Sequence, residues 1–81
     1  MFKKEIILRK DLKGRAAAQI VEKIRELKYS YYLIKDDRKA NLQSLVGTLS
    51  LDLKYNDKVS IVSNIDNIDI IISILKEEEV V

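Results

Sequence analysis

The side chains of this 81-residue sequence that could do chemistry are hydroxyls, amines, guanidinium groups and carboxylates, because the chain contains neither histidine nor cysteine. The usual zinc sites are excluded, since only carboxylates remain as ligands. Mechanisms that use an imidazole base or a thiolate nucleophile are excluded as well. Serine, threonine, lysine and carboxylates are present, but no spacing pairs a nucleophile with a base. We therefore expect a protein that is not an enzyme and that uses no cofactor and no metal.

The charges are unevenly distributed along the chain. Residues 1–40 contain 12 Lys or Arg against 6 Asp or Glu, whereas residues 41–81 contain 3 against 7. This asymmetry indicates a side that faces anions, but it is weaker than the basic stripe of a nucleic-acid-binding module. Phe2 is followed by charged residues, and no stretch approaches the ~20 apolar residues that span a membrane. We expect a soluble cytoplasmic protein that binds neither nucleic acid directly nor membranes.

The elements that must position any site follow from the spacing of the apolar residues. Short apolar or alternating runs predict four strands, at residues 2–8, 30–35, 39–42 and 58–63. After a polar loop, a helical spacing predicts a first helix with one apolar side, made of Ala17, Ile20, Val21, Ile24 and Leu27. A second, short helix follows Ser44. The order β-α-β-β-α-β-α predicts one α+β domain over residues 1–81, with the helices on one face of a four-stranded antiparallel sheet.

The last segment, residues 66–78, has an isoleucine pattern that fits a helix and a strand equally well, and its length favours a helix. In that helix the side that faces the core consists of Ile68, Ile71, Ile72 and Leu75. Ile70 and Ile74 would then lie next to each other on the outer side. An adjacent apolar pair on a surface is a modest sign of contact with another chain, so we expect a weak homodimer.

Ser44 stands at the N-cap of the short second helix, where a serine contributes about 1 kcal/mol by accepting a hydrogen bond from the first turn. Gly47 lies inside this helix and weakens it by about 1 kcal/mol relative to alanine. An interior glycine often marks a position that another group approaches closely. Leu45, Val46 and Leu49 follow Ser44 on the same helix. They could belong to the core or form a small exposed apolar patch for transient recognition.

Three stretches of the sequence, taken together with the order of elements, resemble HPr, the histidine-containing phosphocarrier family of the sugar phosphotransferase system. Residues 41–51 look like the segment in which a regulatory serine opens a short helix and a glycine follows three residues later. Residues 54–59 look like the loop into the last strand. Residues 11–18 occupy the place of the family's active loop. The resemblance covers essentially the whole chain and implies the HPr-like open-faced β-sandwich.

The active loop departs from the family pattern of Gly, an aliphatic residue, His, Ala, Arg, Pro and Ala. Lys13 stands where the phosphoryl-accepting histidine is expected, and Arg15 matches the family. Asp11, Gly14 and Ala16 replace the usual Gly, Ala and Pro. A protonated lysine amine has no free lone pair with which to accept a phosphoryl group. The sequence therefore resembles the HPr-like proteins that lost the carrier function and keep only the regulatory serine.

The resemblance implies a regulatory interaction module in carbon catabolite or sugar-uptake control. Ser44 would be phosphorylated by an HPr-type serine kinase, and the short helix would dock a transcription regulator or a metabolic enzyme. Lys13, Gly14 and Arg15 would form a degenerate phosphocarrier site that could hold an anion or serve no role. Exchange of the first strand between two protomers is a second way to form the homodimer. Two alternatives stay open, an adaptor for one enzyme without phosphorylation and, less favoured, a small nucleic-acid binder.

Overall fold

Four strands form one antiparallel sheet in the computed structural model of the protein, which describes residues 1–81. The strands are β1 (Phe2–Ile7), β2 (Tyr31–Lys35), β3 (Arg38–Asn41) and β4 (Lys58–Ser63). Their order in space is β1-β4-β2-β3, so the last strand in sequence pairs with both β1 and β2. This order places β4 inside the sheet and leaves β1 and β3 at its edges.

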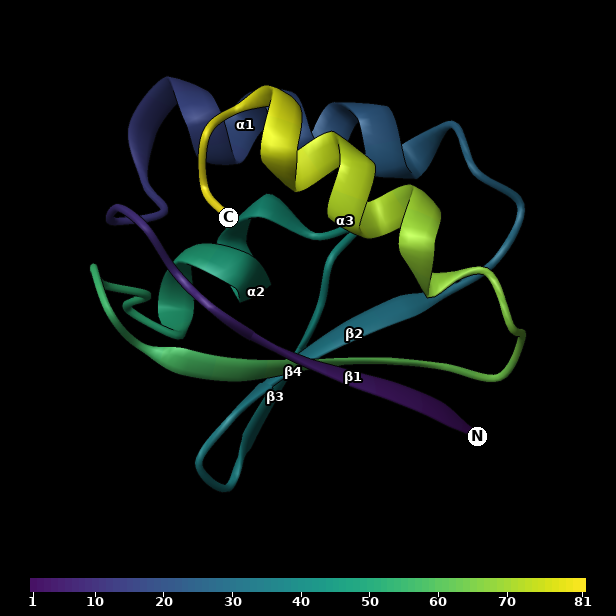
Figure 1. Ribbon diagram of the computed structural model, residues 1–81. Coiled ribbons are helices and arrows are strands. Elements are labelled where there is room, and N and C mark those ends of the chain that lie inside the picture. The colour runs from purple at the N-terminus through teal and green to yellow at the C-terminus, as the bar shows by residue number, and fades with distance from the viewer.

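Three helices lie on one side of this sheet and leave its other face open (Figure 1). They are α1 (Gly14–Arg25), α2 (Leu45–Ser50) and α3 (Ile68–Glu77). The observed order is β-α-β-β-α-β-α, and the arrangement is the predicted α+β fold. None of the three helices is long and apolar enough to span a membrane.

The core lies between the helices and the inner face of the sheet. The first helix buries Ala17, Ile20, Val21 and Ile24, as the helical spacing predicts. The middle of the sheet contributes Leu33, Val59 and Ile61, whose side chains are at most 1% exposed. Burying an aliphatic side chain of this size contributes about 1.5–3 kcal/mol, so this layer supplies much of the stability of the fold.

The last helix buries a wider stripe than its sequence pattern predicts. Ile74 is 9% exposed and belongs to the core, whereas Ile70 is 41% exposed. The prediction that the two form an outer apolar pair is therefore wrong for Ile74. The reason is that α3 packs against α1 as well as against the sheet. An ion pair of 2.8 Å between Lys23 Nζ and Glu77 Oε2 joins these two helices and raises the pKa of Lys23.

The C-terminal end of α3 closes with a Schellman motif. The Glu79 N–H donates to the Lys76 carbonyl over 3.0 Å, and the Val80 N–H donates to the Leu75 carbonyl over 2.9 Å. Glu79 adopts φ 61°, the left-handed conformation that this motif requires and that usually belongs to glycine. The Val80 carbonyl then accepts a hydrogen bond of 2.7 Å from the Arg9 N–H. The motif thus ties the end of the chain to the loop that follows β1.

Replacing Glu79 by glycine should stabilise the protein by about 0.5–1 kcal/mol, because glycine adopts a positive φ without a steric penalty. Urea denaturation of Glu79→Gly measures the change. The matched control is Lys76→Gly, which places glycine at an exposed helical position of the same element and should destabilise it by up to about 1 kcal/mol. A Glu79→Gly variant that unfolds as easily as Lys76→Gly would contradict this account of the turn.

Candidate functional site

Ser44 caps the short helix α2, as its position in the sequence predicts. Its backbone is extended, with φ −109° and ψ 116°, and its Oγ accepts a hydrogen bond of 3.0 Å from the Gly47 N–H. The Ser44 carbonyl also accepts the first helical bond, from the Thr48 N–H at 2.9 Å. The side chain is only half-buried. The hydroxyl oxygen of this partly exposed residue is therefore held in place by the backbone of the first turn.

Gly47 lies where the Ser44 side chain approaches the helix. A Cβ atom at this position would stand 3.1 Å from Ser44 Oγ and 3.4 Å from Ser44 Cβ. The expectation that a group approaches this glycine is confirmed, and the group is the capping serine itself. Glycine weakens the helix interior, but here it leaves room for the cap to bend back over the first turn.

Two side chains hold the N-terminal end of α2 to the end of α1. The Arg25 Nε donates to the Gln43 carbonyl over 2.8 Å. The Gln43 side-chain amide donates in turn to the carbonyls of Leu27 and Tyr29, at 3.5 Å and 3.2 Å. Those carbonyls follow the last turn of α1. A guanidinium group therefore lies on the residue directly before Ser44.

The β2–β3 hairpin holds the C-terminal end of α2. The Arg38 guanidinium donates to the carbonyl of Ser50, the last residue of α2. The Lys35 ammonium donates to the Asp52 carbonyl, two residues beyond the helix, over 2.9 Å. The last carbonyls of a helix lack partners inside it and carry partial negative charge, so cations stabilise them. No motif signals these four anchors. Arg25, Lys35 and Arg38 lie on other elements, and Gln43, which directly precedes Ser44, binds carbonyls after the end of α1.

Lys35 also pairs with Asp57 across 2.9 Å. The hydrogen bond from Lys35 and a second one from the Lys54 N–H, at 2.8 Å, lower the pKa of Asp57 below its usual 3.8. One ammonium group thereby binds both the end of α2 and the loop before β4. This makes Lys35 the common anchor of the two segments.

The three apolar residues of α2 differ in exposure. Val46 is 80% exposed and Leu49 is 41% exposed, whereas Leu45 packs partly buried against the core. The residue of α2 that is buried instead is Thr48, whose hydroxyl lies 3.4 Å from the Asn41 carbonyl. Of the two alternatives for the helix, an apolar surface therefore fits Val46 and Leu49, and the core fits Leu45.

Lys13, Gly14 and Arg15 are all exposed at the start of α1. Lys13 is the N-cap residue and makes no side-chain capping bond, and Gly14 has φ 58°. The Lys13 ammonium lies 3.8 Å from Asp11 Oδ2, while Asp11 Oδ1 accepts a hydrogen bond of 2.7 Å from the Tyr55 N–H. A carboxylate thus already faces this ammonium group. A cation at a helix N-terminus interacts unfavourably with the positive end of the helix dipole. The negative charge of Asp11 offsets this effect for Lys13.

The Lys13 loop and the apolar helix α2 meet at one shallow cavity. It has a volume of about 210 Å³, and its lining includes Lys13, Leu49, Asp52 and Lys54. Lys54 and Asp52 pair across 3.5 Å on its rim. The structure therefore brings the predicted degenerate loop and part of the predicted partner surface together, around paired charges.

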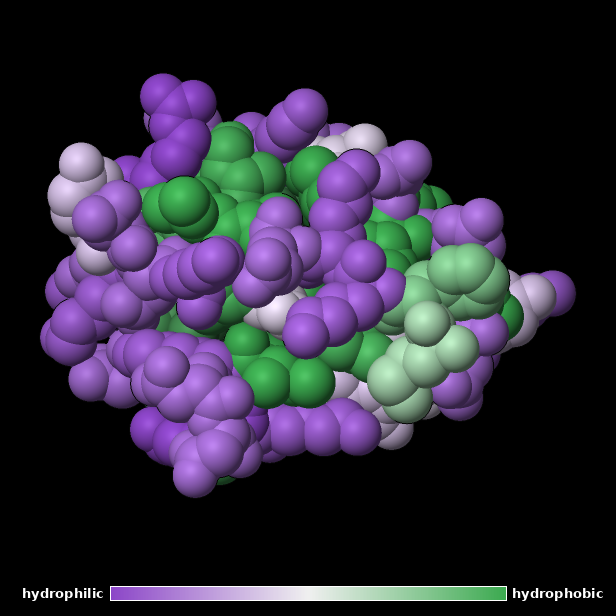
Figure 2. Space-filling view, turned by 60° about the horizontal axis from the view of Figure 1, so that its bottom comes forward, coloured by the Kyte–Doolittle hydropathy of each residue, from purple (hydrophilic) through white to green (hydrophobic).

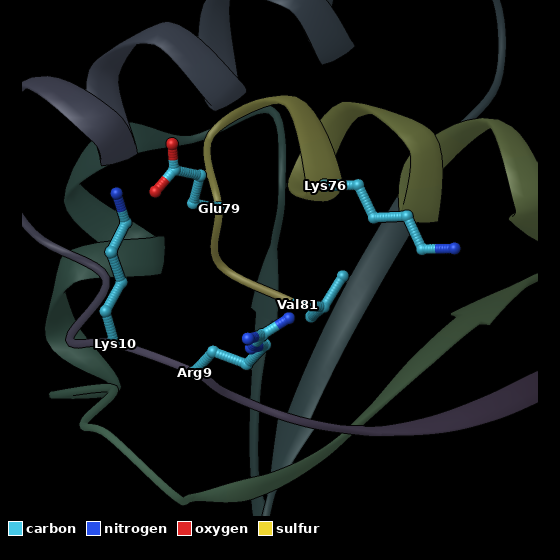
Figure 3. A pocket seen from close by; sticks show the side chains of 5 residues that line it. All are labelled: Arg9, Lys10, Lys76, Glu79 and Val81. Carbon is cyan, nitrogen blue, oxygen red and sulfur yellow. The ribbon is translucent and has the colours of Figure 1, made fainter.

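A larger cavity lies at the other end of the chain, next to the Schellman motif. Figure 3 shows five residues around it, from the loop after β1 and from the end of α3. Its volume is about 550 Å³, and it is lined by Arg9, Lys10, Lys76, Glu79 and Val81. In Figure 3 the Lys76 side chain points away from Lys10 and Glu79. The cations therefore do not converge on one point, and this cavity lacks the geometry of a defined anion site.

The family model described as "PTS HPr component phosphorylation site" matches residues 2–76. The chain belongs to the HPr family. It is thus an HPr-like protein, and HPr-family phosphocarriers are carrier proteins rather than enzymes. No curated protein sequence matches the chain.

Solved HPr structures share the fold along nearly the whole chain. HPr-C-His from Thermoanaerobacter tengcongensis has a TM-score of 0.80 and 23% identity, with 98% of this chain and 91% of that chain covered. HPr from Bacillus anthracis has a TM-score of 0.81 and 19% identity, with 96% of this chain and 95% of that chain covered. The Bacillus subtilis catabolite repression containing protein Crh has a TM-score of 0.71 and 24% identity, with 100% of this chain and 98% of that chain covered. Crh forms a swapped, intertwined dimer. These likenesses confirm the predicted HPr-like fold.

The Lys35–Asp57 pair should make the free energy of unfolding depend on pH in the acidic range. Folding lowers the pKa of Asp57 below the unfolded-state value of 3.8. The charged carboxylate therefore contributes its full stabilisation above pH 3.8, and this stabilisation is lost as the pH falls from 3.8 through the folded-state pKa. Urea denaturation should show Asp57→Asn less stable than the parent at pH 6, with the difference shrinking below pH ~3.8. A difference that stays constant down to pH 2 would contradict a role for this carboxylate's charge.

Proposed function

We propose that this HPr-family protein is a regulatory interaction module that does not carry phosphate and is controlled by phosphorylation of Ser44. Its role lies in carbon catabolite or sugar-uptake regulation. The observation that carries the proposal is the capping geometry of Ser44, a partly exposed residue whose Oγ lies 3.0 Å from the Gly47 backbone nitrogen, in an HPr-family chain without histidine.

The site of Ser44 suits a phosphate group. A phosphoserine adds up to two negative charges at pH 7 and three strong acceptor oxygens. The first backbone N–H groups of α2 face the capping position and lack partners inside the helix. Arg25, which is bound to the Gln43 carbonyl, brings a guanidinium group to the adjacent residue. Phosphorylation can therefore change the charge of this surface without refolding the protein.

The surface next to Ser44 suits transient recognition of a partner. Val46 and Leu49 expose apolar side chains on the same short helix, and the Lys13 loop borders it. A partner that docks on these apolar residues also senses the charge on Ser44. By family likeness the partners are an HPr-type serine kinase and a transcription regulator or metabolic enzyme. Lys13, Gly14 and Arg15 form the degenerate carrier site in this proposal.

Incubation with an HPr-type serine kinase and ATP should add one phosphate, which mass spectrometry should locate on Ser44. Ser44→Ala should abolish the modification. The matched control is Ser50→Ala, because Ser50 is an exposed serine of the same helix whose Oγ donates to the Gly47 carbonyl over 2.6 Å. The control should be phosphorylated as fully as the parent. Phosphate on Ser50 or Ser60 instead would refute the assignment, and no phosphate at all would favour the adaptor without phosphorylation.

A further inference from the structure

The strand β1 leaves one long edge of the sheet unpaired. It runs for six residues in continuous register with β4, from Phe2 opposite Ser63 to Ile7 opposite Lys58. It contains neither a bulge nor a proline, the devices by which proteins commonly protect an edge strand. The opposite edge, β3, has only four residues. The sheet therefore offers β1 as a template for one further strand.

The register assigns each residue of β1 to a face of the sheet. Lys3 lies opposite Val62 and Glu5 opposite Ser60 on the open face, since their neighbours Val59 and Ile61 belong to the core on the helix side. Phe2, Lys4 and Ile6 therefore point to the helix side. Figure 2, which brings the open side of the sheet forward, shows apolar patches separated by polar side chains. No broad apolar face competes with the edge for a partner there.

One antiparallel register makes β1 complementary to itself. With Lys4 on a two-fold axis, Lys3 stands opposite Glu5 of a second copy on the open face, and this pair occurs twice. Phe2 stands opposite Ile6 of the second copy on the helix side, also twice. Residues directly opposite each other in an antiparallel pair must lie on the same face of the sheet. The next possible symmetric registers therefore have Lys3 opposite Lys3, or Glu5 opposite Glu5. Each of those places two like charges together on the open face, where they repel.

Each lysine at the axis already has a carboxylate of its own chain beside it. Lys4 Nζ lies 3.1 Å from Asp69 Oδ1 of α3, so the two Lys4 side chains of a dimer would each have their own carboxylate. Glu5 is likewise near Lys58, at 3.7 Å. In the self-complementary register Glu5 then lies between Lys58 of its own chain and Lys3 of the second copy. All three registers place like charges at the axis, but only the register centred on Lys4 adds pairs of opposite charge across the contact, between Lys3 and Glu5, and these two pairs favour it.

We propose that two copies of this chain associate through β1, antiparallel with Lys4 opposite Lys4, to form a continuous eight-stranded sheet without exchange of strands. This assembly differs from a swapped dimer such as that of Crh, because each β1 stays paired with its own β4. It does not depend on phosphorylation of Ser44, which lies in a different element. The contact is small, so the dissociation constant should be about 10⁻⁴ to 10⁻³ M.

The absence of native cysteine makes a single-cysteine test specific. In Lys4→Cys the two Cα atoms would lie about 4.5–5.5 Å apart across the axis, within the range that a disulfide bridges. Mild oxidation at several hundred micromolar should convert most of this variant to a covalent dimer. The matched control is Ile7→Cys, exposed on the same strand but about 20 Å from its copy in this register. Cross-linking of Lys4→Cys no faster than Ile7→Cys would overturn the proposed register.

A charge exchange tests the complementary pairs in solution. Lys3→Glu and Glu5→Lys should each raise the dissociation constant about fivefold or more, measured by sedimentation equilibrium, because each places like charges opposite one another twice. The double variant Lys3→Glu with Glu5→Lys restores opposite charges at both positions and should recover the dimer. A double variant as weak as the single variants, or a parent that stays monomeric at 1 mM, would overturn the proposal.

A staple separates edge pairing from strand exchange. Ile7→Cys with Lys58→Cys joins β1 to β4 at a pair that lies opposite in the register. With edge pairing the disulfide forms inside each chain, so a non-reducing denaturing gel shows a monomer while sedimentation still shows a dimer. A covalent dimer on that gel, or the loss of association once the chains are stapled internally, would show exchange and overturn the proposal.

Discussion

A helix of six residues is too short to be stable by itself, and the candidate site of this protein depends on the contacts that hold α2 at both ends. Arg25 and Gln43 join the residue before its N-cap to α1. On the β2–β3 hairpin, Arg38 binds the last carbonyl of the helix and Lys35 binds the Asp52 carbonyl just beyond it. These contacts are made at the two ends of the helix, so they leave its outward side free. Val46 and Leu49 can then be exposed without loosening the fold.

The same arrangement explains how a charge on Ser44 could act locally. The capping oxygen is part of the first turn, and the turn is fixed from outside by side chains of other elements. A phosphate at this position adds charge to a surface that already has its shape. Lys13 and Leu49 line the same cavity, so the Lys13 loop belongs to the same surface. A partner that covers Leu49 would therefore also lie next to Lys13.

The sequence predicted the order of elements, the core side of α1 and the cap at Ser44, because local periodicity and a capping serine depend on near neighbours in the chain. Ile74 was misplaced because periodicity within one helix does not reveal a second packing partner, here α1. The anchors of α2 were missed for a similar reason. From the sequence, Lys35 and Arg38 are ordinary charged residues of a hairpin. Only the folded sheet places them next to the carbonyls at the C-terminal end of α2. Contacts between distant elements come from the fold as a whole.

We propose that this HPr-family scaffold serves regulation rather than phosphoryl transfer, and the decisive assay is transfer of phosphate from phosphoenolpyruvate. The protein, mixed with the first enzyme of the phosphotransferase system and labelled phosphoenolpyruvate, should acquire no acid-labile label, because the chain has no imidazole to form phosphohistidine. An authentic HPr in the same assay is the positive control. Stoichiometric labelling of this protein that disappears in Lys13→Ala would contradict the account.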